Sequence, residues 1–333
     1  MRDLVIRAPD DFHVHFRSGP GLEKFVRRTA ALFDRALPMP NTLPPLADAA
    51  SLRAYASSVR AAAPALDLVL SFKLLPGMDT ETVRSLAGAG ARVGKYYPAG
   101  ATTHSSDGIR EPGEIREALA AMEDAGLVLS VHGEDPAAPV LERERAFLPV
   151  VRGLLDDYPR LRIVLEHLST REAAEFVAAG PRRLGATVTA HHLSFTTDDL
   201  AGRALNPHLY CKPVLQDAAH RAALRKAAAA CERVFFGSDS APHPRDRKES
   251  GSIPPGIYAA PVALPLLAAA FEEEDALDRL EDFASARGAS FYGLPPNRSR
   301  VRLVRETWTV PDEVDGAVPA AAGSALAWTA ERV

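Results

Sequence analysis

The sequence predicts an α/β protein that forms one closed (β/α)8 barrel of the TIM type. Short apolar runs rich in Val, Leu and Ile alternate with Ala-, Glu- and Arg-rich segments of helical period, which is typical of buried parallel strands joined by crossover helices. Eight such units fill roughly 290 residues, more than an open doubly wound sheet needs. The first strand ends in histidines, where a dinucleotide-binding sheet would have a glycine-rich turn.

Each strand is expected where an apolar run is bounded by polar or turn-forming residues. In chain order these are the segment that reaches 13–16, then 35–39, 67–72, 92–96, 127–132, 162–167, 186–190 and 234–237. Helices expected between them include 46–62, 112–125, 138–158, 171–179 and 218–231. The alanine-rich stretches 222–230 and 265–270 are expected on helix surfaces, because Ala has the best helix propensity. No Ser/Gly-rich linker divides the chain, so residues 1–333 are expected to form a single domain.

Composition excludes several classes of function. The formal net charge is −4, so nothing attracts the chain generally to nucleic acid or to anionic lipid. Two cysteines cannot build a disulfide framework or a thiolate metal site, which favours a reducing compartment. The N-terminus has no long apolar stretch of the signal-peptide kind, and no run approaches the ~18 apolar residues of a membrane span. We therefore expect a cytoplasmic protein with a small-molecule substrate.

Polar side chains that bind metals gather where the expected strands end. His13 and His15, spaced by one residue, point to the same side of an extended strand. The others follow or lie within four further strands, at the end of the barrel where such enzymes place their chemistry. They are Lys95, His132, His167 and Asp239.

Each of these residues alone is weak evidence. A single histidine at a strand end is more often a satisfied polar residue than a ligand, and a buried lysine is ordinarily paired with a carboxylate. Their location at the same end of five strands favours a shared site. Imidazole and carboxylate ligands without a thiolate suit Zn²⁺ or a similar ion in a catalytic site.

Seven short sequences in the chain resemble those of the single-domain, bacterial-type dihydroorotases, within the amidohydrolase superfamily. The first, an HxHxR pattern, is shared with other cyclic-amide hydrolases and indicates only the superfamily. The combination of YPA-ATT, VHGE and GSDSAPH is far more specific. The seven are Asp10-Asp-Phe-His-Val-His-Phe-Arg17, Met39-Pro-Asn-Thr42, Lys95-Tyr-Tyr-Pro-Ala-Gly-Ala-Thr-Thr103, Val131-His-Gly-Glu134, Glu166-His167, Pro207-His-Leu-Tyr-Cys-Lys-Pro213 and Gly237-Ser-Asp-Ser-Ala-Pro-His243.

The resemblance implies reversible hydrolysis of L-dihydroorotate to N-carbamoyl-L-aspartate, in pyrimidine biosynthesis, by a homodimer with two Zn²⁺ per subunit. His13, His15 and Asp239 would hold the first ion, and His132 and His167 the second. Lys95, carboxylated by CO2 to N6-carboxylysine, would bridge them. Asp239 would be the general base and then the general acid, because a neutral amide nitrogen leaves badly without a proton.

The same resemblance implies a set of substrate contacts. Arg17 offers the planar fork that matches a carboxylate, with Asn41 and His243 beside it. His15 and His132 would also contact substrate. Two backbone contacts align with Lys212, where an apolar residue is familiar, and with Pro255. Proline has no N–H, so that hydrogen bond is either lost or supplied by Gly256. Thr102 and Thr103 match a mobile loop that closes over substrate; His104 beside them replaces an amide.

Two alternatives stay open. A related hydantoinase or allantoinase usually carries a β-rich domain built from both termini, and about ten residues before the first histidine leave no room for one. An inactive homologue serving as a partner subunit would have lost metal ligands, and every expected ligand is present. Four further histidines are expected to be structural or on the surface: His191, His192, His208 and His220.

Overall fold

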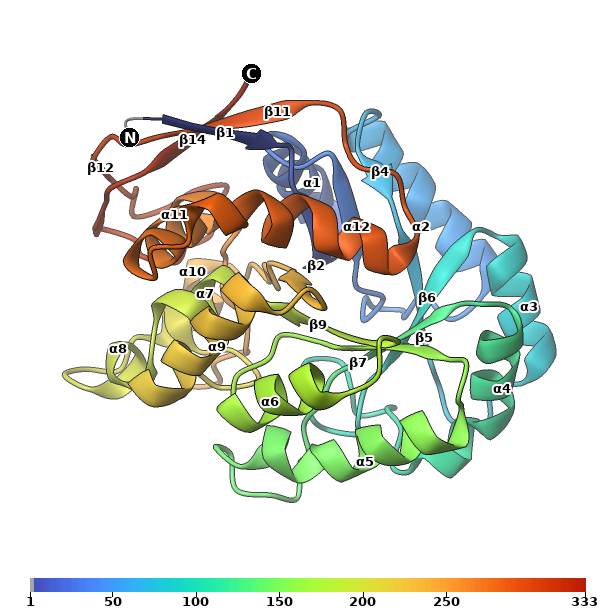
Figure 1. Cartoon of the computed structure of the whole chain (residues 1–333). Helices are drawn as coiled ribbons and strands as arrows, with labels where there is room; N and C mark the ends of the chain where they lie inside the picture. Colours follow the sequence, from blue (N-terminus) through green and yellow to red (C-terminus); the bar gives the residue numbers. More distant parts are fainter. Residues whose placement is uncertain (1–2) are drawn as a thin grey trace.

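The computed structural model describes residues 3–333, and its centre is a barrel of eight parallel strands (Figure 1). All eight predicted strands are present. The third is interrupted at Val69, so that its first half pairs with the strand before it and its second half with the strand after it. The strands are β2 (Asp10–Val14), β3 (Arg35–Pro38), β4 with β5 (Asp67–Leu68 and Leu70–Lys73), β6 (Ala91–Tyr96), β7 (Val128–Val131), β8 (Arg162–Leu165), β9 (Leu184–Val188) and β10 (Val234–Phe236).

Backbone hydrogen bonds between the first and last strands close the barrel. The ladders run β2-β3-β4 and β5 through β10 in sequence order. The His15 N–H donates to Ser240 O at 3.0 Å, and the Asp239 N–H donates to His13 O at 2.7 Å. The predicted closed (β/α)8 architecture is therefore confirmed, and the first and last strands meet at the end where the ligand candidates lie.

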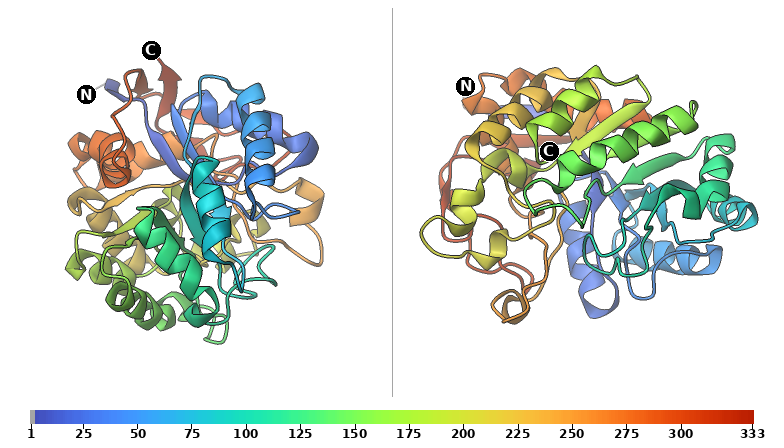
Figure 2. Two further views of the ribbon diagram at one scale, coloured as in Figure 1. Left: turned by 90° about the vertical axis from the view of Figure 1, so that its right-hand side faces the viewer. Right: turned by 90° about the horizontal axis from the view of Figure 1, so that it is seen from below.

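Helices surround the barrel (Figure 2). Several predicted boundaries were wrong by a few residues: α2 begins at Ala49, after Asp48 accepts hydrogen bonds from the Ala50 and Ser51 N–H groups, and not at residue 46. Among residues 3–333, no helix is both long and apolar enough to cross a membrane. The helices are α1 (Leu22–Ala30), α2 (Ala49–Ala62), α3 (Thr80–Gly88), α4 (Arg116–Asp124), α5 (Arg143–Asp157), α6 (Arg171–Ala179), α7 (Ala190–Ser194), α8 (Thr197–Ala201), α9 (Ala218–Ala230), α10 (Arg245–Lys248), α11 (Ala263–Glu273) and α12 (Arg287–Tyr292).

One expectation about the C-terminal part was wrong, and one small sheet there was not predicted. The 265–270 stretch does not lie on a surface, because α11 packs against α7 and the terminal strands and is buried almost all round. The two ends of the described chain do form β structure: β1 (Asp3–Arg7) pairs antiparallel with β11 (Arg300–Val304), which pairs with β14 (Thr329–Arg332). Figure 1 shows this sheet beside α11. A short β12–β13 hairpin (Trp308–Thr309 and Ala325–Leu326) lies next to it.

Apolar side chains fill the barrel below the strand ends. Phe12 stacks on Tyr292 of α12 with ring centroids 4.7 Å apart, and Val93, Val128 and Val164 pack around them. The close approach of α12 depends on Gly288, where a Cβ atom would lie 2.3 Å from the Phe12 ring. The polar residues at the carboxyl ends of the strands therefore lie on a packed apolar layer.

Arginines hold the ends of four helices at the opposite face. Arg183 donates to Leu155 O and Tyr158 O at the end of α5, and Arg233 donates to Ala178 O and Gly180 O at the end of α6. The other two follow the same pattern: Arg162 donates to Gly126 O beyond α4, and Arg287 to Ala228 O and Ala229 O in α9. A cation at this position satisfies carbonyls that have no partner within the helix and interacts favourably with its dipole.

We predict that Arg183→Met lowers the free energy of unfolding by about 1–3 kcal/mol, because it leaves carbonyls at the end of α5 without their charged donor. Urea denaturation monitored by circular dichroism measures the change. Arg182→Met, which alters the exposed neighbouring arginine, is the matched control and should shift stability by less than about 0.5 kcal/mol. Equal stability of the two variants would contradict a capping role for Arg183.

Candidate active site

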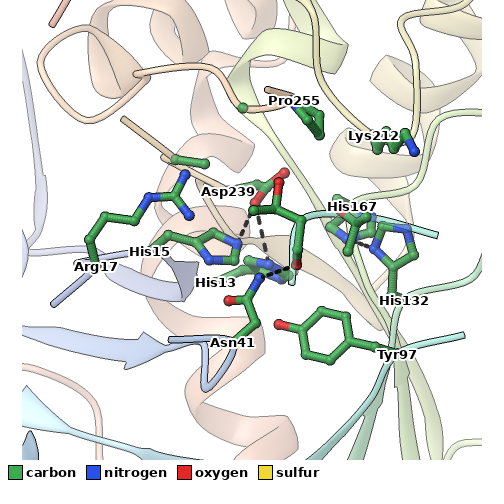
Figure 3. A pocket seen from close by; sticks show the side chains of 14 residues that line it. His13, His15, Arg17, Asn41, Tyr97, His132, His167, Lys212, Asp239 and Pro255 are labelled. Atoms are coloured by element: carbon green, nitrogen blue, oxygen red, sulfur yellow. Dashed lines mark hydrogen bonds and ion pairs between the residues drawn. The ribbon is translucent and has the colours of Figure 1, made fainter. Parts of the chain in front are cut away.

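Side chains from most of the strands meet in a pocket at the carboxyl end of the barrel (Figure 3). All the predicted site residues line this pocket, except Lys95 and His243. Lys95 lies beneath the pocket, and His243 lies beside Arg17. The lining residues are His13, His15, Arg17, Asn41, Tyr97, Thr102, Thr103, His132, His167, Lys212, Asp239, Ala241, Pro255 and Gly256.

Asp239 is the centre of the first group of possible metal ligands. Its Oδ1 atom lies 3.0 Å from His15 Nε2 and 3.4 Å from His13 Nε2, as the dashed lines of Figure 3 mark. Burial alone would raise the pKa of Asp239, but its contacts with His15 and His13 hold that pKa well below the ordinary value. Asp239 is therefore a carboxylate at neutral pH, facing two imidazole nitrogens.

A buried carboxylate that the sequence motifs did not assign orients His13. Glu166 Oε2 lies 2.8 Å from His13 Nδ1, and Glu166 also accepts from Ser130 Oγ at 2.5 Å and Thr187 Oγ1 at 2.6 Å. Burial by itself would raise the pKa of Glu166, but the charges of His13 and Lys95 and these hydrogen bonds lower it. Because Nδ1 of His13 faces Glu166, its Nε2 is the ring nitrogen directed toward Asp239.

His132 and His167 form the second group. His132 Nδ1 lies 3.1 Å from His167 Nε2, while His132 Nε2 contacts Glu134 Oε2 at 2.7 Å. Burial lowers the pKa of both imidazoles, so both are neutral, the form that binds metals. Within residues 3–333, His167 Nδ1 has no hydrogen-bond partner.

Lys95 is fully buried, and its Nζ has no hydrogen-bond partner in the described part of the chain. The ordinary explanation of a buried lysine, a direct pair with a carboxylate, therefore does not apply. Burial lowers the pKa of Lys95 to about 8, so about a tenth is the free amine at pH 7. An orphaned amine whose charge acts on Asp239, His132 and His167 fits a modified lysine that joins two metal ions.

A half-buried guanidinium, that of Arg17, lies on the other side of Asp239. Arg17 donates from Nε to Pro242 O at 3.2 Å, and its Nη2 lies 2.9 Å from His243 Nε2. Among the described residues no carboxylate forms an ion pair with it. Burial lowers the pKa of Arg17 to about 10, so it stays charged at neutral pH. A charged, half-buried guanidinium without a protein carboxylate is a receptor for a ligand's carboxylate.

The loop after α10 offers no free backbone donor at the predicted position. The Gly256 N–H donates to Tyr210 O at 2.9 Å, so it does not replace the N–H that Pro255 lacks. The Pro255 carbonyl lies 3.1 Å from His243 Nε2. Lys248 Nζ fixes both backbone segments of this wall by donating to Tyr210 O, Pro254 O and Gly256 O at 2.8–3.1 Å.

The histidines expected to be structural have partners of that kind, with one exception. His192 bonds Thr189 Oγ1 and the Pro213 carbonyl, His208 contacts Glu249, and His220 accepts from the Arg171 N–H. His191 has no partner for either ring nitrogen within residues 3–333, although it is buried beside His192 and Cys211.

Tyr97 is a pocket residue that the motifs did not single out. Its side chain is buried, its hydroxyl has no hydrogen-bond partner in residues 3–333, and its ring lies 5.3 Å from Lys95 Nζ. Figure 3 shows the Tyr97 hydroxyl pointing into the pocket, toward Asn41. The only signal in the sequence was its position two residues after Lys95.

A closed barrel with buried imidazoles and a carboxylate at its mouth defines a metal-dependent hydrolase of the amidohydrolase class. A family model described as "Amidohydrolase" matches residues 11–253. A solved structure titled "L-Hydantoinase (Dihydropyrimidinase) from Arthrobacter aurescens" aligns over 99% of this chain and 83% of its own, with a TM-score of 0.85. At 17% identity this likeness shows the fold alone.

Relatives of higher sequence identity indicate which family within this class the chain belongs to. A protein of Hahella chejuensis named "Dihydroorotase" is 41% identical, with 99% of each chain covered. The crystal structure of dihydroorotase from Saccharomyces cerevisiae, in complex with 5-fluoroorotic acid, has a TM-score of 0.93 at 32% identity and covers 100% of this chain and 99% of its own. This chain belongs to the dihydroorotase family.

Gly237, two residues before Asp239, lies so close to the His13 side chain that a larger residue there should disturb the site. A Cβ atom on Gly237 would lie 2.8 Å from His13 Cβ and 3.1 Å from Thr187 Cβ, so Gly237→Ala should displace His13 and the hydroxyl that holds Glu166. We expect about 10- to 100-fold weaker Zn²⁺ binding, measured by competition with a chelator. Gly251→Ala, at an open surface position, is the control. Unchanged Zn²⁺ affinity in Gly237→Ala would show that the ligands tolerate the displacement.

Proposed function

We propose that the protein catalyses the reversible hydrolysis of L-dihydroorotate to N-carbamoyl-L-aspartate, in pyrimidine biosynthesis, with two zinc ions. One observation carries the proposal: a metal-ligand cluster and the half-buried Arg17 guanidinium, which has no carboxylate partner among residues 3–333, line the same pocket. The cluster suits hydrolysis of an amide, and the guanidinium suits the carboxylate that dihydroorotate bears on the same ring.

In this proposal His13, His15 and Asp239 hold the first ion, and His132 and His167 hold the second. Lys95, as N6-carboxylysine formed with CO2, is the bridge. A carbamate supplies two anionic oxygens where the amine now has no partner, in a ligand set that otherwise has one carboxylate. The zinc ions, when bound, supply Lewis-acid chemistry toward the scissile amide.

Asp239 performs the proton transfers. It is ionised at neutral pH, so it can accept a proton from the attacking water and return it to the amide nitrogen as the carbon–nitrogen bond breaks. In the direction of ring closure the same carboxyl group takes the proton from that nitrogen.

Arg17, Asn41 and His243 hold the substrate carboxylate and thereby fix the amide over the ligand cluster. Thr102, Thr103, Lys212 and Pro255 line the same pocket. We add the Tyr97 hydroxyl to this set: burial raises its pKa well above the ordinary value, so it stays protonated and can donate to the ring.

The carboxylate separates this proposal from the alternatives. A hydantoin without a carboxylate would leave the Arg17 guanidinium buried and unpaired, which disfavours its binding. An inactive homologue would have no need of the complete ligand set. Purified protein should therefore contain zinc and reduce dihydroorotate absorbance, with hydantoin and allantoin as control substrates. Absence of turnover by the zinc-loaded protein would reject the proposal.

The homodimer, the single domain over residues 1–333 and the cytoplasmic location stay predictions. Light scattering coupled to size-exclusion chromatography tests the first of them directly.

For Lys95 we predict that Lys95→Ala reduces zinc content and activity together, because the bridge between the two ligand groups is lost. A short carboxylic acid in the assay should partly restore both by supplying the missing anionic oxygens. Metal analysis and turnover, with and without added acetate, measure this. Two tightly bound zinc ions and wild-type activity in Lys95→Ala would exclude a bridging role.

For Arg17 we predict that Arg17→Lys keeps the charge and loses the two-pronged contact with the substrate carboxylate. The value of kcat/KM should fall by about 10- to 100-fold, mainly through KM if the contact is equally strong in the ground and transition states. Steady-state kinetics measure it, with Arg182→Lys as the control. Unchanged kinetics would assign carboxylate recognition to other residues.

A further inference from the structure

The loop over residues 99–109, which carries Thr102 and Thr103, has a regular hydrogen-bonded framework of its own. The Ala99 N–H donates to Ile109 O, and the Ile109 N–H to Tyr97 O, at 3.0 and 2.8 Å. Nearer the tip, Ser105 Oγ accepts from the Thr102 N–H and donates to Thr102 O. The loop is therefore a stiff unit, and its position over the pocket depends on what holds its tip.

Lys73, the last residue of β5, reaches that tip. Its side chain is 1% exposed, and its Nζ donates to His104 O at 2.7 Å and to the half-exposed carboxylate of Asp107. Lys73 pairs in register with Lys95 on the neighbouring strand, yet it does not line the pocket. Neither the expected metal site nor the expected substrate contacts use this buried cation.

Asn41 holds the same tip from the other side. Its Nδ2 donates to Thr103 O at 3.2 Å, and its backbone carbonyl lies 3.0 Å from His104 Nδ1, close enough for the ring to donate. His104 has a φ of 53°, a left-handed conformation that few residues other than glycine adopt. These contacts give a physical role to His104, which stands where the resemblance predicts an amide. Its ring contacts Asn41, beyond the end of β3, and its carbonyl accepts from Lys73 of β5.

We propose that Lys73 is a positioning residue that holds the 99–109 loop closed, with Thr102 and Thr103 over the substrate. Movement of the loop away from the barrel would leave a buried ammonium without the His104 and Asp107 oxygens, which costs free energy unless water replaces both. Lys73 thereby favours the closed loop before substrate binds. The consequence for catalysis rests on the function proposed above for the two threonines; the consequence for the loop does not.

The test uses Lys73→Met in the full-length, zinc-loaded protein, with Lys226→Met on the exposed face of α9 as the matched control. We expect amide hydrogen exchange in the peptide covering 99–109 to be at least about five-fold faster without ligand in Lys73→Met. The KM for dihydroorotate should rise about ten-fold with kcat changed less, because a closed population reduced to about one tenth lowers apparent affinity by that factor. Zinc content should not change.

Asp107→Asn is the second variant, since it leaves the buried lysine in place, and it should shift both measurements in the same direction by a smaller factor. If Lys73→Met does not fold, Asp107→Asn and His104→Ala decide the question. Unchanged exchange of the loop and unchanged KM in the folded variants would overturn the proposal. If the wild-type protein does not turn over dihydroorotate, the proposed function fails, and the exchange rates alone still decide whether Lys73 holds the loop.

Discussion

The site depends on the interaction of one buried carboxylate, that of Glu166, with donors from three strands. His13 of β2, Ser130 of β7 and Thr187 of β9 all donate to it, so the carboxylate lies where the ends of these strands converge. A buried anion is stable only when it is satisfied in this way, so the three donors and the acceptor fix one another's positions. The orientation of His13, and through it the arrangement around Asp239, follows from this network.

Charge is distributed unevenly across the barrel mouth, and this distribution matches the proposed chemistry. Two acidic side chains, Glu166 and Glu134, contact one nitrogen of His13 and of His132, and the other nitrogen of each ring faces Asp239 or His167. The cation Arg17 lies at the edge of the pocket without a carboxylate of its own among the described residues. An anionic substrate in this pocket would thus have the Arg17 guanidinium on one side and the imidazole nitrogens on the other.

The sequence predicted the eight strands and the meeting of His13, His15 and Asp239 at their ends, because both depend on local signals. A run of buried residues identifies a strand, and a strand end in a parallel barrel has a known location. Glu166, Lys73 and Tyr97 were not assigned roles, since their importance arises only from the register of strands that lie far apart in the chain. The burial of α11 was missed for a similar reason: alanine favours a helix equally well inside and outside, and only the terminal sheet decides which.

The four arginines at the opposite face, Arg162, Arg183, Arg233 and Arg287, recognise main-chain carbonyls and not side chains. Every residue type supplies a carbonyl, so the helices can accept many substitutions in their last turns while the contact persists. Each of these contacts therefore depends on the identity of only one residue, the arginine. Homologues that diverge widely in helix sequence can keep the same architecture, and the loops at the other end are free to specialise.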